Sequence, residues 1–131
     1  MDLLHRDITS TVLQGFYAVA NALPFGLDKS FYCNAFDIEL QLLSLRTHKN
    51  RQQSIFFKEQ EIGQITFDIV VNNSVLLHII SQKEMILTEQ VDSAKNYLKL
   101  SDFEVLLLLN FGQEADHKRI ILTNNYKPGG E

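Results

Sequence analysis

Two residues that can bind metals stand close together in the middle of the chain. Asp68 ends the segment "GQITFD", and His78 lies inside the apolar segment "VLLHII". Imidazole suits transition metals better than Mg²⁺, so the pair would form part of a Mn²⁺ or Zn²⁺ site that a partner completes. Metal sites need three or four ligands, and only two are visible. We therefore favour a structural alternative, in which a neutral His78 is hydrogen-bonded to Asp68 or to a group near Lys29, and we expect no bound metal.

Nucleophilic catalysis has little support in the sequence. Cys33 is the only cysteine, and no histidine near it in the sequence would act as a base, so we expect a packing role. No serine stands in the strand–turn–helix context of a nucleophile elbow. A glycine-rich phosphate-binding loop is also absent from the sequence.

The densest basic patch is "RTHKNRQQ", which contains Arg46, Lys49 and Arg51. It precedes the first predicted strand and contains no aromatic residue on which a base would stack. The patch is typical of a solvated helix end, and contact with a nucleic-acid phosphate is the alternative.

Composition predicts one ordered domain over residues 1–131. Hydrophobic residues make up 45% and charged residues 21% of the chain, which are ordinary values for a globular protein. The net charge of −4 provides no overall positive field for nucleic acid. One cysteine excludes an internal disulfide, and no apolar run is long enough to cross a membrane. We expect a cytoplasmic protein without membrane contact.

Helical periodicity predicts three helices. The first begins at a cap at Thr9 or Ser10 and ends near Ala22, before the breaker "ALPFG". The second begins near Asp28 or Ser30, and the third covers residues 87–98 with Thr88 as its N-cap. In the second helix one apolar stripe predicts the buried face; it consists of Phe31, Ala35, Ile38, Leu42 and Leu45.

Five segments have the pattern of strands. "SIFFKEQEIGQITFDIVV" predicts a hairpin with a tight turn around residues 59–63 and Gly63 as the turn residue, and "NNS" predicts the next turn. "VLLHII" and "EVLLLLNF" are apolar on both faces, as in central strands that are covered on both sides. "KRIILT" predicts a final edge strand. The order of elements predicts an α/β fold with a mixed central sheet of about five strands, flanked by helices and followed by a flexible tail at 122–131.

Several short strings, in this order, resemble the GxxExxY proteins of the PD-(D/E)XK nuclease superfamily. The naming motif falls on "GLDKSFY", and the other landmarks are "IG" at 62–63, "ITFD", "NYL" at 96–98, "LLLNFG" and "KRI" at 118–120. The resemblance covers about residues 8–121. It implies a restriction-endonuclease-like fold.

The resemblance also implies where a nuclease site would lie. In such a site carboxylates hold Mg²⁺, and a lysine two positions after the second carboxylate helps to orient or deprotonate the attacking water. Carried over to this sequence, only Asp68 is retained. The helical glutamate falls on Lys29, the glutamate and lysine of the strand fall on His78 and Ile80, and the supporting glutamine falls at or near Ser93. These five residues would form a cleft that has lost its catalytic groups. The charge reversal suggests that Lys29 forms an ion pair with Asp68; the alternative is that Lys29 is solvated on the second helix.

We therefore expect a catalytically inactive nuclease homologue that acts as a protein-interaction or regulatory module in a prokaryotic or phage system. Its partner would be another protein or a second copy of the chain. One alternative is a nucleic-acid-binding protein that does not cleave. The other is a Mg²⁺- or Mn²⁺-dependent nuclease with a rearranged site, in which Glu84, Glu89 or Asp92 supplies a displaced acid.

Overall fold

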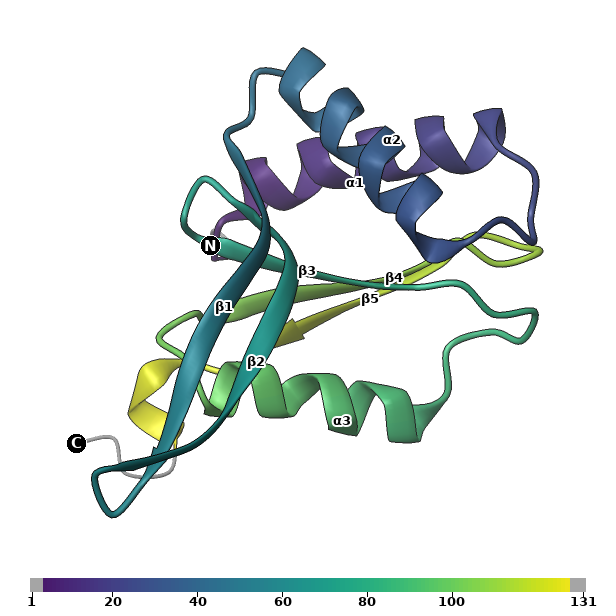
Figure 1. The fold of residues 1–131 in the computed structure, drawn as a ribbon. Coiled ribbons are helices and arrows are strands. Elements are labelled where there is room, and N and C mark those ends of the chain that lie inside the picture. Colours follow the sequence, from purple (N-terminus) through teal and green to yellow (C-terminus); the bar gives the residue numbers. More distant parts are fainter. Residues whose placement is uncertain (1–3, 128–131) are drawn as a thin grey trace.

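A computed structural model describes residues 4–127 and shows three layers. A five-stranded mixed sheet lies between α1 and α2 on one face and α3 on the other (Figure 1). The predicted α/β fold is thus confirmed. The elements in chain order are α1 (Arg6–Ala22), α2 (Lys29–Leu42), β1 (Thr47–Phe57), β2 (Gln60–Val71), β3 (Val75–Ile80), α3 (Thr88–Lys99), β4 (Val105–Asn110), β5 (Asp116–Ile121) and the short 3₁₀ helix η1 (Asn124–Tyr126).

The strands lie in the sheet in their order along the chain. β3 and β4 are parallel and the other neighbours are antiparallel. A parallel pair requires a crossover connection, and α3 provides it. Every residue of β4 is buried, which confirms that this strand is covered on both faces. β5 lies at one edge, as predicted.

Two hydrophobic clusters fill the spaces on either side of the sheet. The cluster beneath α1 and α2 includes Phe16, Tyr32, Phe36, Leu77, Leu107 and Phe111. The cluster beneath α3 includes Phe67, Leu76, Ala94, Leu98, Leu106 and Leu108. Successive residues of β3 and β4 alternate between the two clusters because side chains point to opposite faces of a strand.

α1 begins earlier than predicted. Its N-cap is His5, and Thr9 lies inside the helix, where its hydroxyl donates a hydrogen bond to the carbonyl of Arg6 at 3.1 Å. A threonine hydroxyl can bond backward within a helix as well as cap it, so the residue type alone does not locate the start. The helix ends at Ala22 as predicted, and Gly26 takes a φ of 102° in the loop that follows.

The buried face of α2 differs from the prediction. Tyr32, Phe36 and Leu40 face the sheet. Three residues of the predicted stripe face outward instead: Phe31 is 56% exposed, Ile38 61% and Leu42 74%. The other two, Ala35 and Leu45, are half-buried and pack against the core. α2 carries two apolar stripes, and packing against α1 and the sheet selects the one with the larger aromatic residues. Its start is as expected, with the Asp28 carboxylate accepting a hydrogen bond from the Ser30 N–H at 3.1 Å.

The β1–β2 hairpin is longer than predicted, and it turns at the start of the predicted range and not at Gly63. Lys58 and Glu59 both have positive φ, as in a two-residue type I′ turn. Gly63 lies within β2, opposite Ile55, so its prediction as the turn residue is wrong. The predicted turn at "NNS" is present, with positive φ at Asn72 and Asn73.

β1 begins at Thr47, so the basic patch lies on a strand and its prediction as a helix end is wrong. Asn50 has a φ of 56°, which interrupts the alternation of side chains along the strand. Lys49 consequently contacts Asn34 of α2, whereas Arg51 contacts Asn73 and lies over the ring of Phe103 beside α3.

α3 has Leu87 as its N-cap, and not Thr88 as predicted. The side chain of Gln90 accepts a hydrogen bond from the Leu87 N–H at 2.9 Å, which is half of a capping box. The apolar side chain of Leu87 provides no acceptor for the other half.

The chain after β5 packs against the body as far as Lys127, although the sequence predicted a flexible tail from residue 122. The Asn124 N–H donates to the Glu104 carboxylate at 2.7 Å, and the Lys127 ammonium donates to the carbonyl of Ser101 at 2.7 Å. The rest of the predicted tail, 128–131, lies outside the described residues. Within residues 4–127, no helix is long and apolar enough to cross a membrane.

Candidate functional site

Asp68 occupies the point where β2 separates from β3. The ladder between these strands has three residue pairs and ends at Ile69 and Leu77. Beyond it, Oδ2 of Asp68 accepts a hydrogen bond from the Ile79 N–H at 2.8 Å. The carboxylate thus replaces a backbone acceptor that the diverging strand no longer provides, and only 15% of its side chain is exposed.

Lys29, in the first turn of α2, reaches the same carboxylate. Its Nζ lies 3.0 Å from Oδ1 of Asp68, so the expected ion pair is present. The two oxygens of Asp68 therefore have different partners: an ammonium on Oδ1 and a backbone N–H on Oδ2.

His78 lies next to Asp68 but is not hydrogen-bonded to it. Its Nδ1 is 3.9 Å from Oδ2 of Asp68, which is too long for a hydrogen bond, so that expectation is wrong. The imidazole packs instead against the ring of Tyr97 on α3, with 4.9 Å between the ring centroids. Burial lowers the pKa of His78 below its ordinary 6.5; Asp68 opposes this effect and Lys29 adds to it. His78 is therefore neutral at pH 7.

A cavity of about 220 Å³ lies between β3 and α3. His78, Ile80 and Ser93, which the sequence placed in one cleft, all line it. The other lining residues are Glu89, Gln90, Ala94, Tyr97 and Leu108. Gln90 and Tyr97 were not predicted from the sequence as site residues. Gln90 lies three residues before Ser93, and Tyr97 lies four residues after it. This spacing places all three on one face of a helix and is the sequence signal that could have identified them.

Buried amides hold the loop that leads from β3 into α3. Gln82 and Gln90 donate to each other through their side-chain amides, at 2.9 and 2.6 Å. Asn110, fully buried at the end of β4, accepts from the Gln82 N–H at 3.0 Å and donates to the carbonyl of Glu84 at 2.9 Å. Gly112 permits this approach, because a Cβ there would lie 2.4 Å from the Gln82 carbonyl oxygen. The network fixes the position of α3 relative to β3 and hence the shape of the cavity.

Comparison with known proteins identifies the family. A family model described as the PD-(D/E)XK nuclease superfamily matches residues 6–121, which include all three α-helices and all five strands. The chain belongs to this superfamily. A search of curated proteins and a search of solved structures each found no match.

The Mg²⁺ site expected of a PD-(D/E)XK nuclease does not fit the side chains in this cleft. Mg²⁺ requires near-octahedral oxygen ligands, and Asp68 is the one carboxylate at the junction of β2 and β3. Both of its oxygens already have donors. Among residues 4–127, no three His, Cys, Asp or Glu side chains lie close enough together to bind one ion. The same holds for Glu84, Glu89 and Asp92, the acids proposed for a rearranged site. Of these three, Glu89 alone lines the cavity with His78.

Cys33 lies on α2, near the ion pair, and is half-buried. Burial raises the pKa of its thiol to about 11, with a smaller contribution from Asp68 in the same direction. A thiol with this pKa is almost entirely protonated at neutral pH and is a poor nucleophile. This agrees with a packing role.

The basic patch is divided between two sides of β1. Arg46 and Arg51 line one hollow of about 360 Å³, together with His48 and Asn73. Lys49 points toward α2, where its Nζ lies 4.0 Å from the Asp37 carboxylate. The three basic residues therefore do not form one surface.

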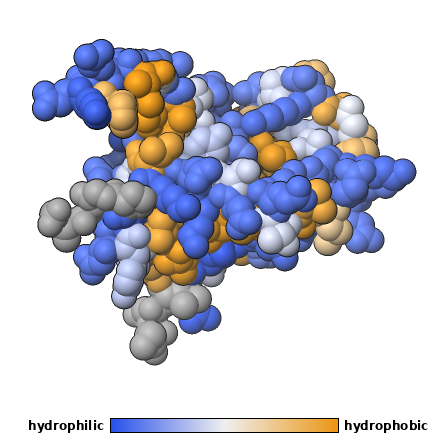
Figure 2. Space-filling view, turned by 90° about the horizontal axis from the view of Figure 1, so that it is seen from below, coloured by the Kyte–Doolittle hydropathy of each residue, from blue (hydrophilic) through white to orange (hydrophobic). Residues whose placement is uncertain are grey.

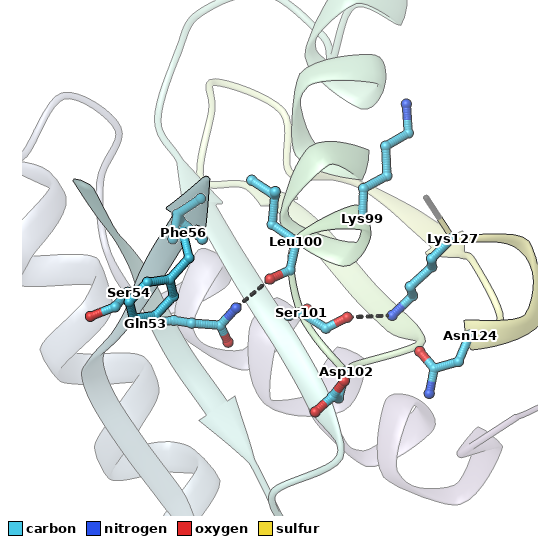
Figure 3. Close-up of a pocket in the computed structure, with 10 residues that line it drawn as sticks. Gln53, Ser54, Phe56, Lys99, Leu100, Ser101, Asp102, Asn124 and Lys127 are labelled. Carbon is cyan, nitrogen blue, oxygen red and sulfur yellow. Dashed lines mark hydrogen bonds between the residues drawn. The ribbon is translucent and has the colours of Figure 1, made fainter. Parts of the chain in front are cut away.

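A larger hollow of about 600 Å³ lies away from Asp68, between β1, the end of α3 and η1 (Figure 3). Gln53 of β1 donates to the carbonyl of Leu100, and Lys127 donates to the carbonyl of Ser101, as Figure 3 shows. Desolvation lowers the pKa of Lys127, partly offset by Glu104 and Asp102. These bonds satisfy carbonyls at the C-terminal end of α3, so the polar groups here have a structural role.

Proposed function

We propose that this protein is a catalytically inactive PD-(D/E)XK homologue, similar to the GxxExxY proteins, that acts by binding another protein. The observation that carries the proposal is the environment of Asp68. Lys29 lies on one carboxylate oxygen and the Ile79 N–H on the other, so the carboxylate at the junction of β2 and β3 is already ion-paired and hydrogen-bonded. The ammonium of Lys29 occupies the place that a metal ion would need.

The second part of the site supports the same proposal. Ile80 lies two residues after His78 on β3 and lines the same cavity. If Ile80 stands where a nuclease has its lysine, no group at this position exchanges a proton with water. His78 packs on Tyr97 and, unlike the glutamate of a nuclease, carries no negative charge to attract a metal ion.

Exposed hydrophobic side chains favour a protein partner. Figure 2 shows the α3 side of the molecule, where hydrophilic residues predominate and hydrophobic residues gather in separate groups. The end of the β1–β2 hairpin exposes Phe56 by 62%, Phe57 by 61% and Ile62 by 66%. α2 exposes Phe31, Ile38 and Leu42 on the opposite side of the sheet. Such groups are typical of interaction surfaces.

Calorimetric titration with Mg²⁺ and Mn²⁺, together with cleavage assays on plasmid and oligonucleotide substrates, tests the inactivity. We expect neither binding nor cleavage. The triple variant Lys29→Glu, His78→Glu, Ile80→Lys restores the acids and the lysine and is expected to bind Mn²⁺. Cleavage by the wild-type protein that is lost in Asp68→Ala would overturn the proposal, whereas equal cleavage by both proteins would identify a contaminant.

Binding of nucleic acid without cleavage is a second candidate function, because Arg46 and Arg51 line one hollow. Two cationic side chains would contact about two phosphates, and the affinity would fall steeply with salt. Fluorescence anisotropy with a labelled duplex at low salt measures it. The variant Arg46→Ala, Arg51→Ala should lose binding while Lys49→Ala retains it. No binding by the wild-type protein at low salt would remove this candidate.

A further inference from the structure

A hollow of about 360 Å³ lies where β1 begins beside the turn between β2 and β3 (Figure 1). It is here called the arginine hollow, and its lining residues are Arg46, Thr47, His48, Arg51, Val70 and Asn73. It shares no lining residue with the cavity at His78. Of the described residues, two arginines and one histidine line it, and no acid does. In a chain of net charge −4, this concentrates positive charge at one place.

The backbone at Asn50 brings the two arginines to one face of β1. In a regular strand Arg46 and His48 would share a face and Arg51 would lie on the other, because side chains alternate. Asn50 has a φ of 56° and interrupts this alternation. Arg51 therefore lines the same hollow as Arg46 and His48.

The neighbouring strand β2 turns over at the same point. Phe67, which pairs with Arg51, packs beneath α3, whereas Ile69, which pairs with Lys49, packs beneath α1 and α2. Both strands thus change the face that they present on passing this step. The arginine hollow is a product of this local backbone geometry, and the spacing of the basic residues along the chain does not predict it.

The guanidinium of Arg51 is held in place without an acid. Its Nη1 donates a hydrogen bond to Oδ1 of Asn73 at 2.8 Å, and its central carbon lies 5.4 Å from the centre of the Phe103 ring. Among residues 4–127, no carboxylate oxygen lies within 4 Å of Arg46 or Arg51. Arg51 is therefore oriented in advance and keeps its charge and further N–H donors for a ligand.

The backbone of Arg46 is fixed to the turn that carries Asn73. The N–H of Arg46 donates to Oδ1 of Asn72 at 2.9 Å, and the carbonyl of Arg46 accepts the N–H of Asn72 at 2.8 Å. This pair of bonds holds the start of β1 against the β2–β3 turn. The two arginines are thus attached to one rigid frame.

The nearest acid in the bonding pattern, Asp37, is used on the other side of β1. Its carboxylate accepts hydrogen bonds from the hydroxyl of Thr47 and from the amide of Gln41, and it lies 4.0 Å from the Nζ of Lys49. Asp37 therefore balances Lys49, and the arginines are left without a negative partner.

Two guanidinium forks and an imidazole are suited to an anion with more than two oxygens. A carboxylate has two oxygens and one charge, and each phosphodiester of a nucleic acid also has one charge. A phosphate monoester has three strong acceptor oxygens and close to two negative charges at pH 7. Arginine pairs with such oxygens through two parallel N–H donors.

We propose that the arginine hollow binds a phosphate monoester, with Arg46 and Arg51 on its oxygens. This site goes beyond the proposed function, because it lies outside the cleft at Asp68 and does not depend on whether that cleft is active. It also differs from the second candidate function, which concerns the phosphodiesters of a duplex. A small phosphorylated molecule and the 5′ end of an oligonucleotide both carry a monoester, and the experiment separates these two sources.

NMR titration of the ¹⁵N-labelled full chain with inorganic phosphate, at constant ionic strength, tests the site. The backbone signals of residues 46–51 and 72–73 should shift, with a dissociation constant on the order of 1 mM. Acetate should bind roughly tenfold more weakly, because it has two oxygens and one charge. No shift at these residues up to about 20 mM phosphate, or equal binding of acetate, would overturn the proposal.

Substitutions separate a defined site from diffuse positive charge. Arg46→Ala and Arg51→Ala should each weaken phosphate binding roughly tenfold. The matched control is Lys49→Ala, which removes the same charge from the other side of β1 and should bind phosphate like wild type. The spectrum of each variant reports whether it is folded. An equal loss in Lys49→Ala would overturn the proposal.

A charge-neutral substitution tests the orientation of Arg51. Asn73 has a φ of 51°, which glycine adopts without strain, so Asn73→Gly removes the acceptor for Arg51 and retains the turn. Binding should weaken roughly threefold, because the guanidinium must then be ordered by the ligand. Unchanged binding would show that charge alone attracts the anion and would overturn the site.

Paired ligands identify the source of the monoester. Adenosine 5′-monophosphate is compared with adenosine, and a single-stranded oligonucleotide with a 5′-phosphate is compared with its 5′-hydroxyl form. Equal affinity for the nucleotide and the phosphorylated oligonucleotide would assign the site to small molecules, and tighter binding of the oligonucleotide would assign it to a 5′ end. Equal binding of the two oligonucleotides would overturn the proposal and leave the second candidate function in place.

Discussion

The ammonium of Lys29 and the carboxylate of Asp68 are 3.0 Å apart and join α2 to the point where β2 leaves β3. The same carboxylate accepts the N–H of Ile79. The pair therefore links three elements, at the position where the resemblance to the nucleases places a metal-binding carboxylate. The ion pair depends on Lys29, whose positive charge is opposite to the negative charge of a metal-binding carboxylate.

The coupling between Lys29 and Asp68 should be measurable but modest. Lys29 is 47% exposed, so solvent screens the pair, and we expect a coupling energy of about 0.5–1 kcal/mol. A double-mutant cycle with Lys29→Met and Asp68→Asn, followed by urea unfolding, measures it. The matched control is Lys49 and Asp37, which are 4.0 Å apart and should couple less. Zero coupling at Lys29 and Asp68 would contradict the ion pair.

The protein should lose stability as the pH falls below 6.5, partly because of His78. Burial lowers the pKa of folded His78, so the unfolded chain binds a proton at a pH where the folded chain does not. His78 contributes fully to stability above pH 6.5, and this contribution is lost as the pH falls through the pKa of His78 in the folded protein. NMR titration gives this pKa directly. His78→Gln should flatten the dependence of the unfolding free energy on pH in this range, and the exposed His48→Gln should not.

The thiol of Cys33 should react slowly with a disulfide reagent. A pKa of about 11, compared with 9.0 for a free thiol, leaves roughly 100-fold less thiolate near pH 8. Ellman's reagent should label the native protein far more slowly than the same protein in denaturant. Equal rates in the two states would show that the thiol is exposed and would contradict its burial.

Replacing the buried Asn110 should destabilise the fold strongly. The side chain is fully buried and bonds to the Gln82 N–H and the Glu84 carbonyl. Asn110→Ala leaves both groups without this partner, which should lower the free energy of unfolding by about 2–3 kcal/mol. Urea unfolding measures the change, with the exposed Asn125→Ala as the control. A loss below that of the control would show that the network contributes nothing.

The hydrophobic pattern was sufficient to predict the types of the elements. Periods of about two and 3.6 residues distinguish strands from helices because they follow from local backbone geometry. The doubly apolar segment around Leu107 was therefore recognisable as a covered central strand, and it is buried throughout. Element boundaries were less predictable, since Thr9 and Gly63 belong to residue types that occur both inside and at the ends of elements.

The buried face of α2 shows what the pattern could not determine. Both stripes of this helix are apolar, and the regular one that contains Ile38 faces outward while Phe36 is buried. The choice depends on the shape of the surface that α1 and the sheet present, which arises from residues distant in the sequence. A local period contains no information about that surface.

By itself, the sequence determined the α/β order of elements, the mixed sheet and the presence of Asp68, His78 and Ile80 on neighbouring strands. Only the tertiary structure decided how their side chains are used. It placed Lys29 and the Ile79 N–H on the two oxygens of Asp68, turned His78 toward Tyr97 and left Phe31, Ile38 and Leu42 of α2 exposed. The physical reason is that composition and period act along the chain, whereas hydrogen bonds, ion pairs and burial depend on groups brought together from separate elements.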